Sequence, residues 1–308
     1  MASQLTALPL RVDEVTRLEA SLATLADYWS LTKPEVNLLI LITTLAGFCL
    51  ALPSPIQHFP VLLLINTLLG TLLVASGTGT LNQFLERNFD AQMRRTSRRP
   101  VASGRINGAS ALWFGIALSC FGCIYLRVAV NTLSSILALI TLLSYLFLYT
   151  PLKRKTPLCT LVGALPGAMP PLIGWAGAAG RLNLEAWSLY AILFLWQFPH
   201  FMAIAWMYRE DYSRAGYLVL PRGEIRGNVM AVQSVAPCLL LMSAGTVPIL
   251  LSHSHPAYWI ANLFFTLCLL FYATRLALQR TNVVAKRLLL ASIIYLPIVF
   301  FVTLLSKA

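Results

Sequence analysis

A short polar segment combines the side chains that hold divalent cations with those that hold phosphates. Asn82, Glu86 and Asp90 are spaced four residues apart, so on a helix they lie along one face, each about 6 Å from the next. Two carboxylates and an amide oxygen in one column suit Mg²⁺, which takes oxygen ligands and is commonly shared with substrate phosphates. We therefore predict a magnesium site on this face.

A run of arginines follows this column directly: Arg94, Arg95, Arg98 and Arg99. Guanidinium groups hold phosphate oxygens in bidentate pairs. If the helix continues through the run, Arg95 and Arg99 share one face and are the best phosphate contacts, with the other two as alternates. Metal ligands beside phosphate ligands indicate a diphosphate site. The alternative is a solvated basic loop that only sets the orientation of the chain in a membrane.

A second acidic cluster occurs further along the chain and again follows an apolar stretch: Tyr208, Glu210, Asp211 and Tyr212. If both clusters lie on the same side of a membrane, they can converge on one diphosphate through metal. Asp211 is then a predicted metal ligand together with the first column. Lys153, in a short basic loop between the clusters, is a further predicted diphosphate contact.

His200 is the only histidine inside an apolar stretch. An ionisable group at membrane depth is a functional candidate, and Pro199 beside it disturbs the helix. The alternative is a histidine that is merely hydrogen-bonded within the fold.

The composition identifies the elements that must position these residues. The 308 residues are 58% hydrophobic and only 11% charged, with a mean hydropathy of +0.73, whereas a soluble domain carries roughly 25% charged residues. Soluble enzymes of any fold are excluded, and an all-α membrane protein remains. The six cysteines lie in apolar stretches, so neither a disulfide framework nor a metal site at Cys120 and Cys123 is favoured over simple packing.

Nine stretches are long and apolar enough to span a membrane, near 36–52, 61–81, 108–127, 130–149, 157–179, 186–208, 229–251, 257–276 and 288–305. With the N-terminus inside, 20 of the 23 lysines and arginines fall in inside segments. Because positive charge marks cytoplasmic loops, we predict an N-in, C-out topology. The net charge of +12 is then a topology signal, and nucleic acid is not a partner.

Two segments have special features. Residues 1–30 form a predicted cytoplasmic tail, in which apolar residues at helical spacing indicate an amphipathic helix at the membrane surface; a simple tether is the alternative. Residues 31–308 form the transmembrane domain. Within it, the span 157–179 contains Pro166, Pro170 and Pro171 among glycines, which predicts a broken helix. Such a helix either borders a cavity or serves close small-residue packing.

The chain resembles the UbiA superfamily of membrane prenyltransferases, and within it the branch that farnesylates haem. The resemblance covers about residues 28–305 and rests on a series of motifs in one order: Thr32-Lys33-Pro34, 82–100, 149–157, 165–175, 196–201, Glu210-Asp211-Tyr212, Ala215-Gly216 and Leu220-Pro221. The first motif of the superfamily is NDxxDxxxD, and here Gln83 and Glu86 replace two aspartates. Its second motif is DxxxD, and here Tyr208 and Tyr212 fall at the aspartate positions.

The resemblance implies a nine-helix fold around a central cavity, in a bacterial cytoplasmic membrane, with the active-site loops on the cytoplasmic side. It also implies the reaction of haem b, farnesyl diphosphate and water to haem o and diphosphate, with Mg²⁺ as cofactor. Haem A synthase or the oxidase assembly machinery are the implied protein partners. His200 is implied to lie in the active cavity, roughly 15 Å along its helix from the second cluster, as a haem ligand, a base or a structural hydrogen-bonding group.

Two other classes of protein share some of these features. Broken helices and an intramembrane histidine also occur in transporters, but both acidic clusters here sit at a membrane edge, where a diphosphate headgroup would lie. A sibling enzyme that prenylates a quinone precursor or chlorophyllide is the other alternative. The missing second DxxxD and the Trp-Gln-Phe-Pro-His segment ending at His200 favour haem.

Overall fold

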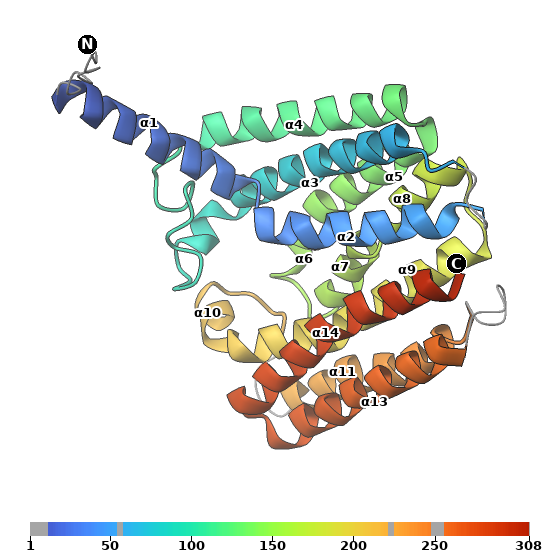
Figure 1. Cartoon of the computed structure of the whole chain (residues 1–308). Coiled ribbons are helices and arrows are strands. Elements are labelled where there is room, and N and C mark those ends of the chain that lie inside the picture. The colour runs from blue at the N-terminus through green and yellow to red at the C-terminus, as the bar shows by residue number, and fades with distance from the viewer. Residues whose placement is uncertain (1–11, 54–57, 221–224, 248–255, 308) are drawn as a thin grey trace, which may run out of the picture.

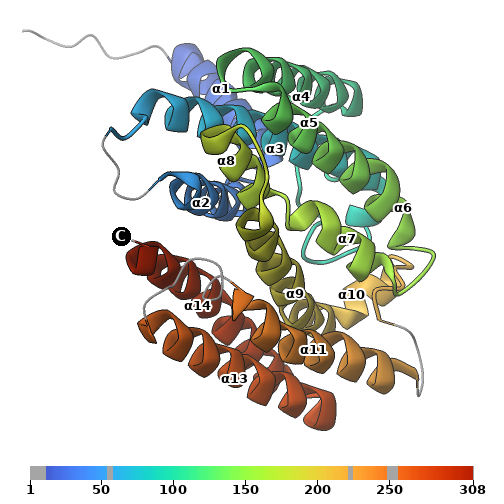
Figure 2. The ribbon, with the colours of Figure 1, turned by 90° about the vertical axis from the view of Figure 1, so that its right-hand side faces the viewer.

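The computed structural model describes residues 12–53, 58–220, 225–247 and 256–307, and over these residues the regular structure is entirely helical. The helices run side by side in one bundle (Figures 1 and 2). Their bounds are α1 Val12–Leu31, α2 Pro34–Ala51, α3 Val61–Asp90, α4 Gly108–Ala129, α5 Thr132–Leu143, the π-helix η1 Ser144–Tyr149, α6 Thr150–Leu152, α7 Cys159–Gly167, α8 Pro170–Ala179, α9 Leu184–Met207, α10 Arg209–Arg214, α11 Ile225–Ala244, α13 Pro256–Gln279 and α14 Asn282–Lys307.

Eight helical stretches in the described part of the chain are long and apolar enough to cross a membrane, and a ninth, Asn228–Ala244, is apolar but shorter. They follow the order of the nine predicted spans. The last residues of the seventh predicted span, 248–251, lie outside the described residues. The protein is a multi-pass integral membrane protein with an all-helical fold, and its N-in, C-out orientation stays a prediction.

The segments that carry the candidate site gather at one end of the bundle (Figure 1). The α1–α2 junction, the loop after α3 and α10 all lie at this end, whereas the C-terminal end of α2 and the N-terminal end of α3 lie at the other. Because α3 runs unbroken from Val61 to Asp90, the acidic column stands on the end of a rigid 30-residue helix.

The predicted break in the fifth span is confirmed. α7 ends at Gly167 and α8 begins at Pro170. Near this break, the side-chain amide of Gln197 on α9 donates a hydrogen bond to the backbone carbonyl of Ala164 on α7 at 3.2 Å. Packing against α8 is close, because a Cβ at Gly174 would overlap the backbone carbonyl of Thr44 on α2. Small-residue packing therefore accounts for the glycines, and the cavity stays a prediction.

A π-helical turn interrupts the fourth span just before Lys153. Within it, the carbonyl of Tyr145 accepts from both the backbone N–H and the hydroxyl of Thr150, the latter at 2.9 Å. Such turns have i→i+5 bonds and often occur at functional sites. The Lys153 ammonium lies 4.6 Å from the ring centre of Tyr149 and 6.0 Å from that of Tyr145.

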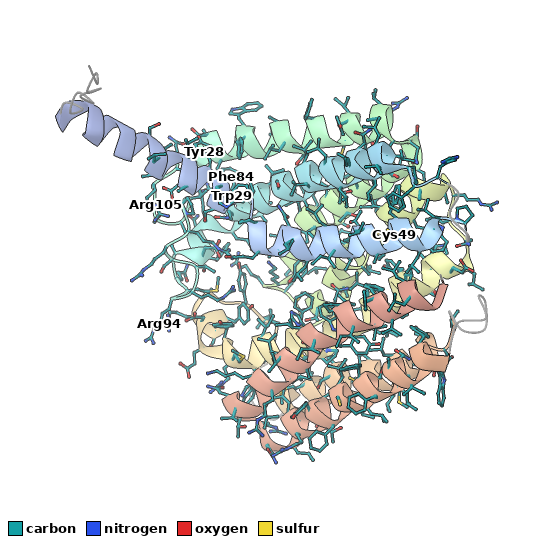
Figure 3. The ribbon with its side chains drawn as sticks, viewed as in Figure 1. Tyr28, Trp29, Cys49, Phe84, Arg94 and Arg105 are labelled. Atoms are coloured by element: carbon teal, nitrogen blue, oxygen red, sulfur yellow. The ribbon has the colours of Figure 1, made fainter. Side chains whose placement is uncertain are left out.

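The predicted N-terminal helix is present as α1, which projects from the bundle (Figure 3). Tyr28 packs edge-on against Phe114, and Asp27 accepts from Arg105 at 2.9 Å. Leu22, Leu25 and Trp29 are exposed. The apolar side of α1 is thus left open, and its position at a membrane surface stays a prediction.

Candidate diphosphate and metal site

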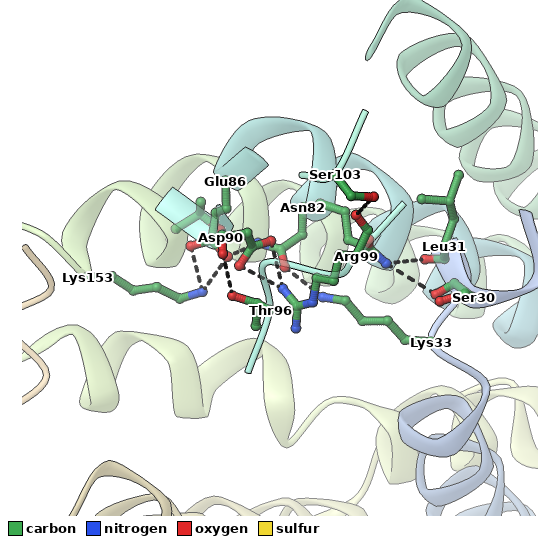
Figure 4. Close-up of polar contacts among 12 residues, drawn as sticks. Ser30, Leu31, Lys33, Asn82, Glu86, Asp90, Thr96, Arg99, Ser103 and Lys153 are labelled. Atoms are coloured by element: carbon green, nitrogen blue, oxygen red, sulfur yellow. Dashed lines mark hydrogen bonds and ion pairs between the residues drawn. The ribbon is translucent and has the colours of Figure 1, made fainter. Parts of the chain in front are cut away.

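The last turns of α3 carry the predicted column in buried form. Asn82, Glu86 and Asp90 are 1%, 4% and 1% exposed, and all three face the same cluster of basic side chains (Figure 4). A buried carboxylate without a partner costs several kcal/mol, so the partners of the two acids define the site.

Glu86 is surrounded by donors from its own helix and from two other parts of the chain. The Lys153 ammonium donates to Oε1 at 2.8 Å and to Oε2 at 3.0 Å. The Asn82 amide donates to Oε2 at 2.8 Å, and the Tyr217 hydroxyl donates to Oε1 at 2.9 Å. Burial alone would lower the pKa of Lys153, but the charge of Glu86 outweighs it and raises that pKa well above its usual range. Lys153 is therefore charged, and its role as a phosphate contact stays a prediction.

Asp90 pairs with the arginine run. One guanidinium nitrogen of Arg99 donates to its two oxygens at 2.9 and 2.8 Å. Asp90 also fixes the loop through its backbone, because its carbonyl accepts from the Thr96 hydroxyl at 2.9 Å. Since one nitrogen serves both carboxylate oxygens, each oxygen keeps capacity for a further partner.

Lys33 enters the site from the α1–α2 junction. Its backbone has a φ of +54°, which is uncommon for any residue but glycine and is often found at functional positions. Its ammonium donates to the side-chain carbonyl of Asn82 at 2.7 Å. Burial, followed by the positive charge of Arg99, lowers the pKa of Lys33 to about 7. The lowered pKa means that the carboxylates nearby do not fully compensate its charge.

Gln83 departs from the aspartate of the superfamily motif and has a different task here. Its amide nitrogen donates to the backbone carbonyls of Ser30 and Leu31, both at 3.2 Å. An aspartate has no such proton at neutral pH. Gln83 therefore ties α3 to the end of α1, on the side of the helix that also holds the Lys33 turn.

The four arginines do not share one helix face, because α3 ends at Asp90. Only Arg99 contacts the column. The Arg95 guanidinium lies 4.9 Å above the ring centre of Tyr208. Arg98 is exposed, and Arg94 points away from the bundle (Figure 3).

The second acidic cluster is built differently from the first. Asp211 is buried and accepts from the backbone N–H of Arg95 at 3.3 Å, and it also pairs with Arg214. The Glu210 side chain is 79% exposed and lies 3.9 Å from Arg209. Asp211 is thus engaged with the arginine loop, whereas Glu210 is exposed and has Arg209 as its ion-pair partner.

The ring of Tyr212 contacts that of Tyr217, with centroids 6.0 Å apart. Through this contact the second cluster touches the first column, because Tyr217 is the residue that donates to Glu86.

His200 lies in α9, the helix that precedes the second acidic cluster in the sequence. Its Nδ1 is 2.8 Å from the hydroxyl of Ser292, and its ring stacks on that of Trp196 at 4.8 Å. The Ser292 hydroxyl also lies 2.7 Å from the Leu289 carbonyl, and when it donates its one proton there, Nδ1 is the donor to Ser292. Among the described residues Nε2 has no hydrogen-bond partner, and its lone pair is available to a ligand.

The chemistry of the column fits a magnesium ion. Its donors are carboxylate and amide oxygens, and Asp90 retains acceptor capacity. In the part of the chain that the structure describes, no group of three or more His, Cys, Asp or Glu is placed to hold a metal ion. An ion here would therefore complete its shell with phosphate oxygens and water, as Mg²⁺ usually does.

Two residues of this site, Lys33 and Tyr217, were not predicted. Lys33 could have been found through the Lys33-Pro34 step, since proline at the first helical position fixes where a span begins. Tyr217 contacts a residue 131 positions away, and no local pattern indicates such a contact.

Comparison with known proteins identifies the family of this chain. Residues 40–302 match the UbiA prenyltransferase family. The chain is 47% identical over 287 residues to the protoheme IX farnesyltransferase of Solibacter usitatus, a match that covers 91% of this chain and 98% of that protein. It is 39% identical over 290 residues to the protein of the same name from Koribacter versatilis, with 92% and 94% covered.

Solved structures share the fold at low sequence identity. A digeranylgeranylglyceryl phosphate synthase superposes with a TM-score of 0.74 at 18% identity, covering 92% of this chain and 98% of that one. A UbiA homolog from Archaeoglobus fulgidus bound to GPP and Mg²⁺ superposes with a TM-score of 0.59 at 13% identity, covering 90% and 99%. Sequence matches over most of the chain and a shared fold lead to one conclusion: this chain belongs to the UbiA prenyltransferase family.

Proposed function

We propose that the protein transfers the farnesyl group of farnesyl diphosphate to a vinyl group of haem b, with addition of water, to give haem o and diphosphate. The names of its relatives support the haem acceptor. The observation that carries the diphosphate donor is the charge at the end of α3, where Lys33, Lys153 and Arg99 face two carboxylates. This surplus of positive charge suits an anionic headgroup.

The cationic side chains have two tasks in this proposal. They bind the diphosphate, and they stabilise the charge that grows on it as the bond to farnesyl C1 breaks. Asn82, Glu86 and Asp90 would hold Mg²⁺, which supplies Lewis-acid stabilisation of the same charge. Arg99 already touches Asp90, so it is positioned to bridge the metal side and the phosphate side of the site.

The bond changes balance as follows. The C–O bond of farnesyl diphosphate breaks, and its electron pair leaves with the diphosphate. The allylic cation adds to the terminal carbon of the haem vinyl group, which moves the positive charge to the carbon next to the porphyrin ring. The oxygen of water bonds to that carbon and releases a proton. Apolar surroundings must protect the first cation from water until the vinyl group has reacted.

His200 is proposed to bind the haem iron. Neutral imidazole is a common ligand of haem iron, and the contact with Ser292 leaves Nε2 as the atom with the lone pair. A hydrogen bond on the other ring nitrogen is the usual way in which a metal-binding histidine is oriented. The stacked ring of Trp196 restricts rotation of the imidazole further.

We place the protein in the bacterial cytoplasmic membrane, with the α3 and α10 end of the bundle on the cytoplasmic side. The positive residues of the predicted inside segments support this orientation. Enzymes that consume haem o, such as haem A synthase or the oxidase assembly machinery, would receive the product in the same membrane. Reporter fusions after residue 154 should read inside and fusions after residue 128 outside.

One assay tests the reaction. Membranes that contain the protein are incubated with haem b, farnesyl diphosphate and Mg²⁺, and the haems are separated by chromatography with mass detection. The expected product is a haem heavier by one farnesyl group and one hydroxyl group, formed only when farnesyl diphosphate is present. Prenylation of a quinone precursor without any new haem would instead support the sibling activity.

A second assay tests His200. The His200→Ala protein should bind haem more weakly and show an altered haem absorption band, while its affinity for a farnesyl diphosphate analogue stays unchanged. His58→Ala, at an exposed position, is the control. An unchanged spectrum with lost turnover would make His200 a base, and no change in either would leave only a structural role.

A further inference from the structure

The loop that follows α10 reaches into the acidic column. Tyr217 is 5% exposed, and its hydroxyl donates to Oε1 of Glu86 at 2.9 Å. The next residue, Leu218, donates its backbone N–H to the carbonyl of Lys153 at 2.7 Å. The loop therefore contacts both members of the Glu86–Lys153 ion pair.

The local structure fixes where Tyr217 points. Gly216 has a φ of +72°, a left-handed backbone that favours glycine, and the N–H of Tyr217 returns to the carbonyl of Tyr212 at 2.8 Å. The Tyr217 ring packs 6.1 Å from Phe89 of α3 and 6.0 Å from Tyr212 of α10. The hydroxyl is thus held against Glu86 by a ring that two helices support.

Glu86 accepts from all the donors that it can accommodate. A carboxylate offers about four lone-pair positions, and here Lys153 takes two, while Asn82 and Tyr217 take one each. Lys153 carries a compact charge on a flexible stem, so it can turn to a phosphate oxygen when a diphosphate enters. Asn82 donates from a short neutral side chain, and Tyr217 donates from a neutral hydroxyl on a packed ring. These two hydrogen bonds to Glu86 therefore remain when Lys153 turns away.

We propose that Tyr217 is a positioning residue that keeps the Glu86 carboxylate oriented toward the metal ion once Lys153 has moved to the diphosphate. Carboxylates that bind metal ions are usually held by hydrogen bonds from outer groups, whose loss costs about 10- to 100-fold in metal affinity or activity. The Tyr217 hydroxyl supplies the proton of this hydrogen bond, because an ionised carboxylate can only accept. The inference rests on the diphosphate-binding part of the proposed function.

The test measures metal binding rather than turnover. The purified full chain is titrated with Mn²⁺, a substitute for Mg²⁺ that electron paramagnetic resonance detects, in the presence of inorganic diphosphate and without haem or farnesyl groups. Tyr217→Phe keeps the ring and should raise the Kd for Mn²⁺ about tenfold. Tyr125→Phe is the matched control, because its hydroxyl also donates to a side-chain oxygen at 2.9 Å, that of Asn66. A Kd for Tyr217→Phe within about twofold of the unaltered protein overturns the proposal.

A double-mutant cycle tests whether Tyr217 acts through Glu86. Glu86→Gln should itself weaken Mn²⁺ binding, and adding Tyr217→Phe to it should change the Kd by less than about twofold. A further full tenfold loss in the double variant would mean that the hydroxyl acts elsewhere, and would overturn the proposal. The proposed function fails separately: if the unaltered protein makes no farnesylated haem but the Mn²⁺ results are as expected, the role of Tyr217 stands and the haem reaction does not.

Discussion

The two acidic clusters lie at the same end of the bundle but use their carboxylates differently. In the first, Glu86 and Asp90 are buried and face the side-chain cations Lys153 and Arg99. In the second, Asp211 accepts from the backbone of the arginine loop, and Glu210 extends into the surroundings.

This difference indicates that the two clusters have different tasks, one in binding a ligand and the other in holding a loop in place. A carboxylate that faces long, flexible cations can exchange them for a metal ion or release them to a phosphate. A carboxylate that accepts from a backbone N–H holds a loop in place, because the donor cannot leave without moving the chain. We therefore propose that the first cluster binds the ligand and that the second, through Asp211, holds the loop that carries Arg95 and Arg99.

The largest effect is expected from Lys153→Met, which keeps the length of the side chain but leaves Glu86 buried without its cation. Turnover should fall about 100-fold, as for other losses of charge stabilisation, and the free energy of unfolding should fall by about 3 kcal/mol. Turnover assays and thermal melting measure the two effects. Lys155→Met, at an exposed position of the same loop, should change neither. A fall in turnover of less than tenfold would remove Lys153 from the site.

A smaller but clear effect is expected from Asp90→Asn, which keeps the size of the side chain and removes the charge. Turnover that depends on Mg²⁺ should fall at least about tenfold, equivalent to ~1.4 kcal/mol of barrier. Glu86→Gln should behave in the same way. Normal turnover with an unchanged Mg²⁺ requirement in both variants would reduce the column to a solvated helix end.

Asp211→Ala should have a modest effect if Asp211 only supports the arginine loop. Loss of its hydrogen bond to the Arg95 backbone costs about 0.7 kcal/mol, so the KM for farnesyl diphosphate should rise about threefold while kcat and the KM for haem stay constant. Steady-state kinetics with each substrate varied in turn provide the measurement. A tenfold fall in kcat with altered Mg²⁺ dependence would instead identify Asp211 as a metal ligand, and the contrast between the clusters would disappear.

The smallest effect is expected from Glu210→Gln. Its side chain is 79% exposed and lies 3.9 Å from Arg209, and exposed ion pairs contribute little. Turnover and both KM values should stay within about twofold of the unaltered protein. A tenfold loss would show that the second cluster also takes part in catalysis.

The acidic column could be predicted because its pattern is local. Residues four apart share a helix face wherever the helix occurs, and α3 does continue from the membrane span through Asp90. The spans and the broken fifth helix were predictable for the same reason, because apolar runs and prolines determine the structure of the segment in which they occur.

The arginine run shows where local pattern stops being sufficient. The chain turns directly after Asp90, where the carbonyl of that residue accepts from the N–H of Met93 and from the Thr96 hydroxyl. Such side-chain contacts compete with a helix. Arg99 therefore reaches Asp90 across a loop instead of along a helix face.

The individual contacts between distant parts of the chain could not be predicted. Lys33 and Asn82 are 49 residues apart, and Glu86 and Tyr217 are 131 apart. Their meeting depends on how whole helices pack, and no periodicity within either segment specifies it.

The π-helical turn in the fourth span makes the number of residues in that span part of the site. If the turn became α-helical while Ser144–Tyr149 kept all its residues, everything beyond it would rotate by about 100°, and Lys153 would leave Glu86. The lipid-facing side chains before the turn can be substituted without moving Lys153 away from Glu86. The interval from Asn131, which caps α5, to Lys153 therefore fits the site only when its residue count matches the π-helical turn. The site is encoded by a fixed count of residues as well as by a motif, so insertions and deletions here would be more damaging than most substitutions.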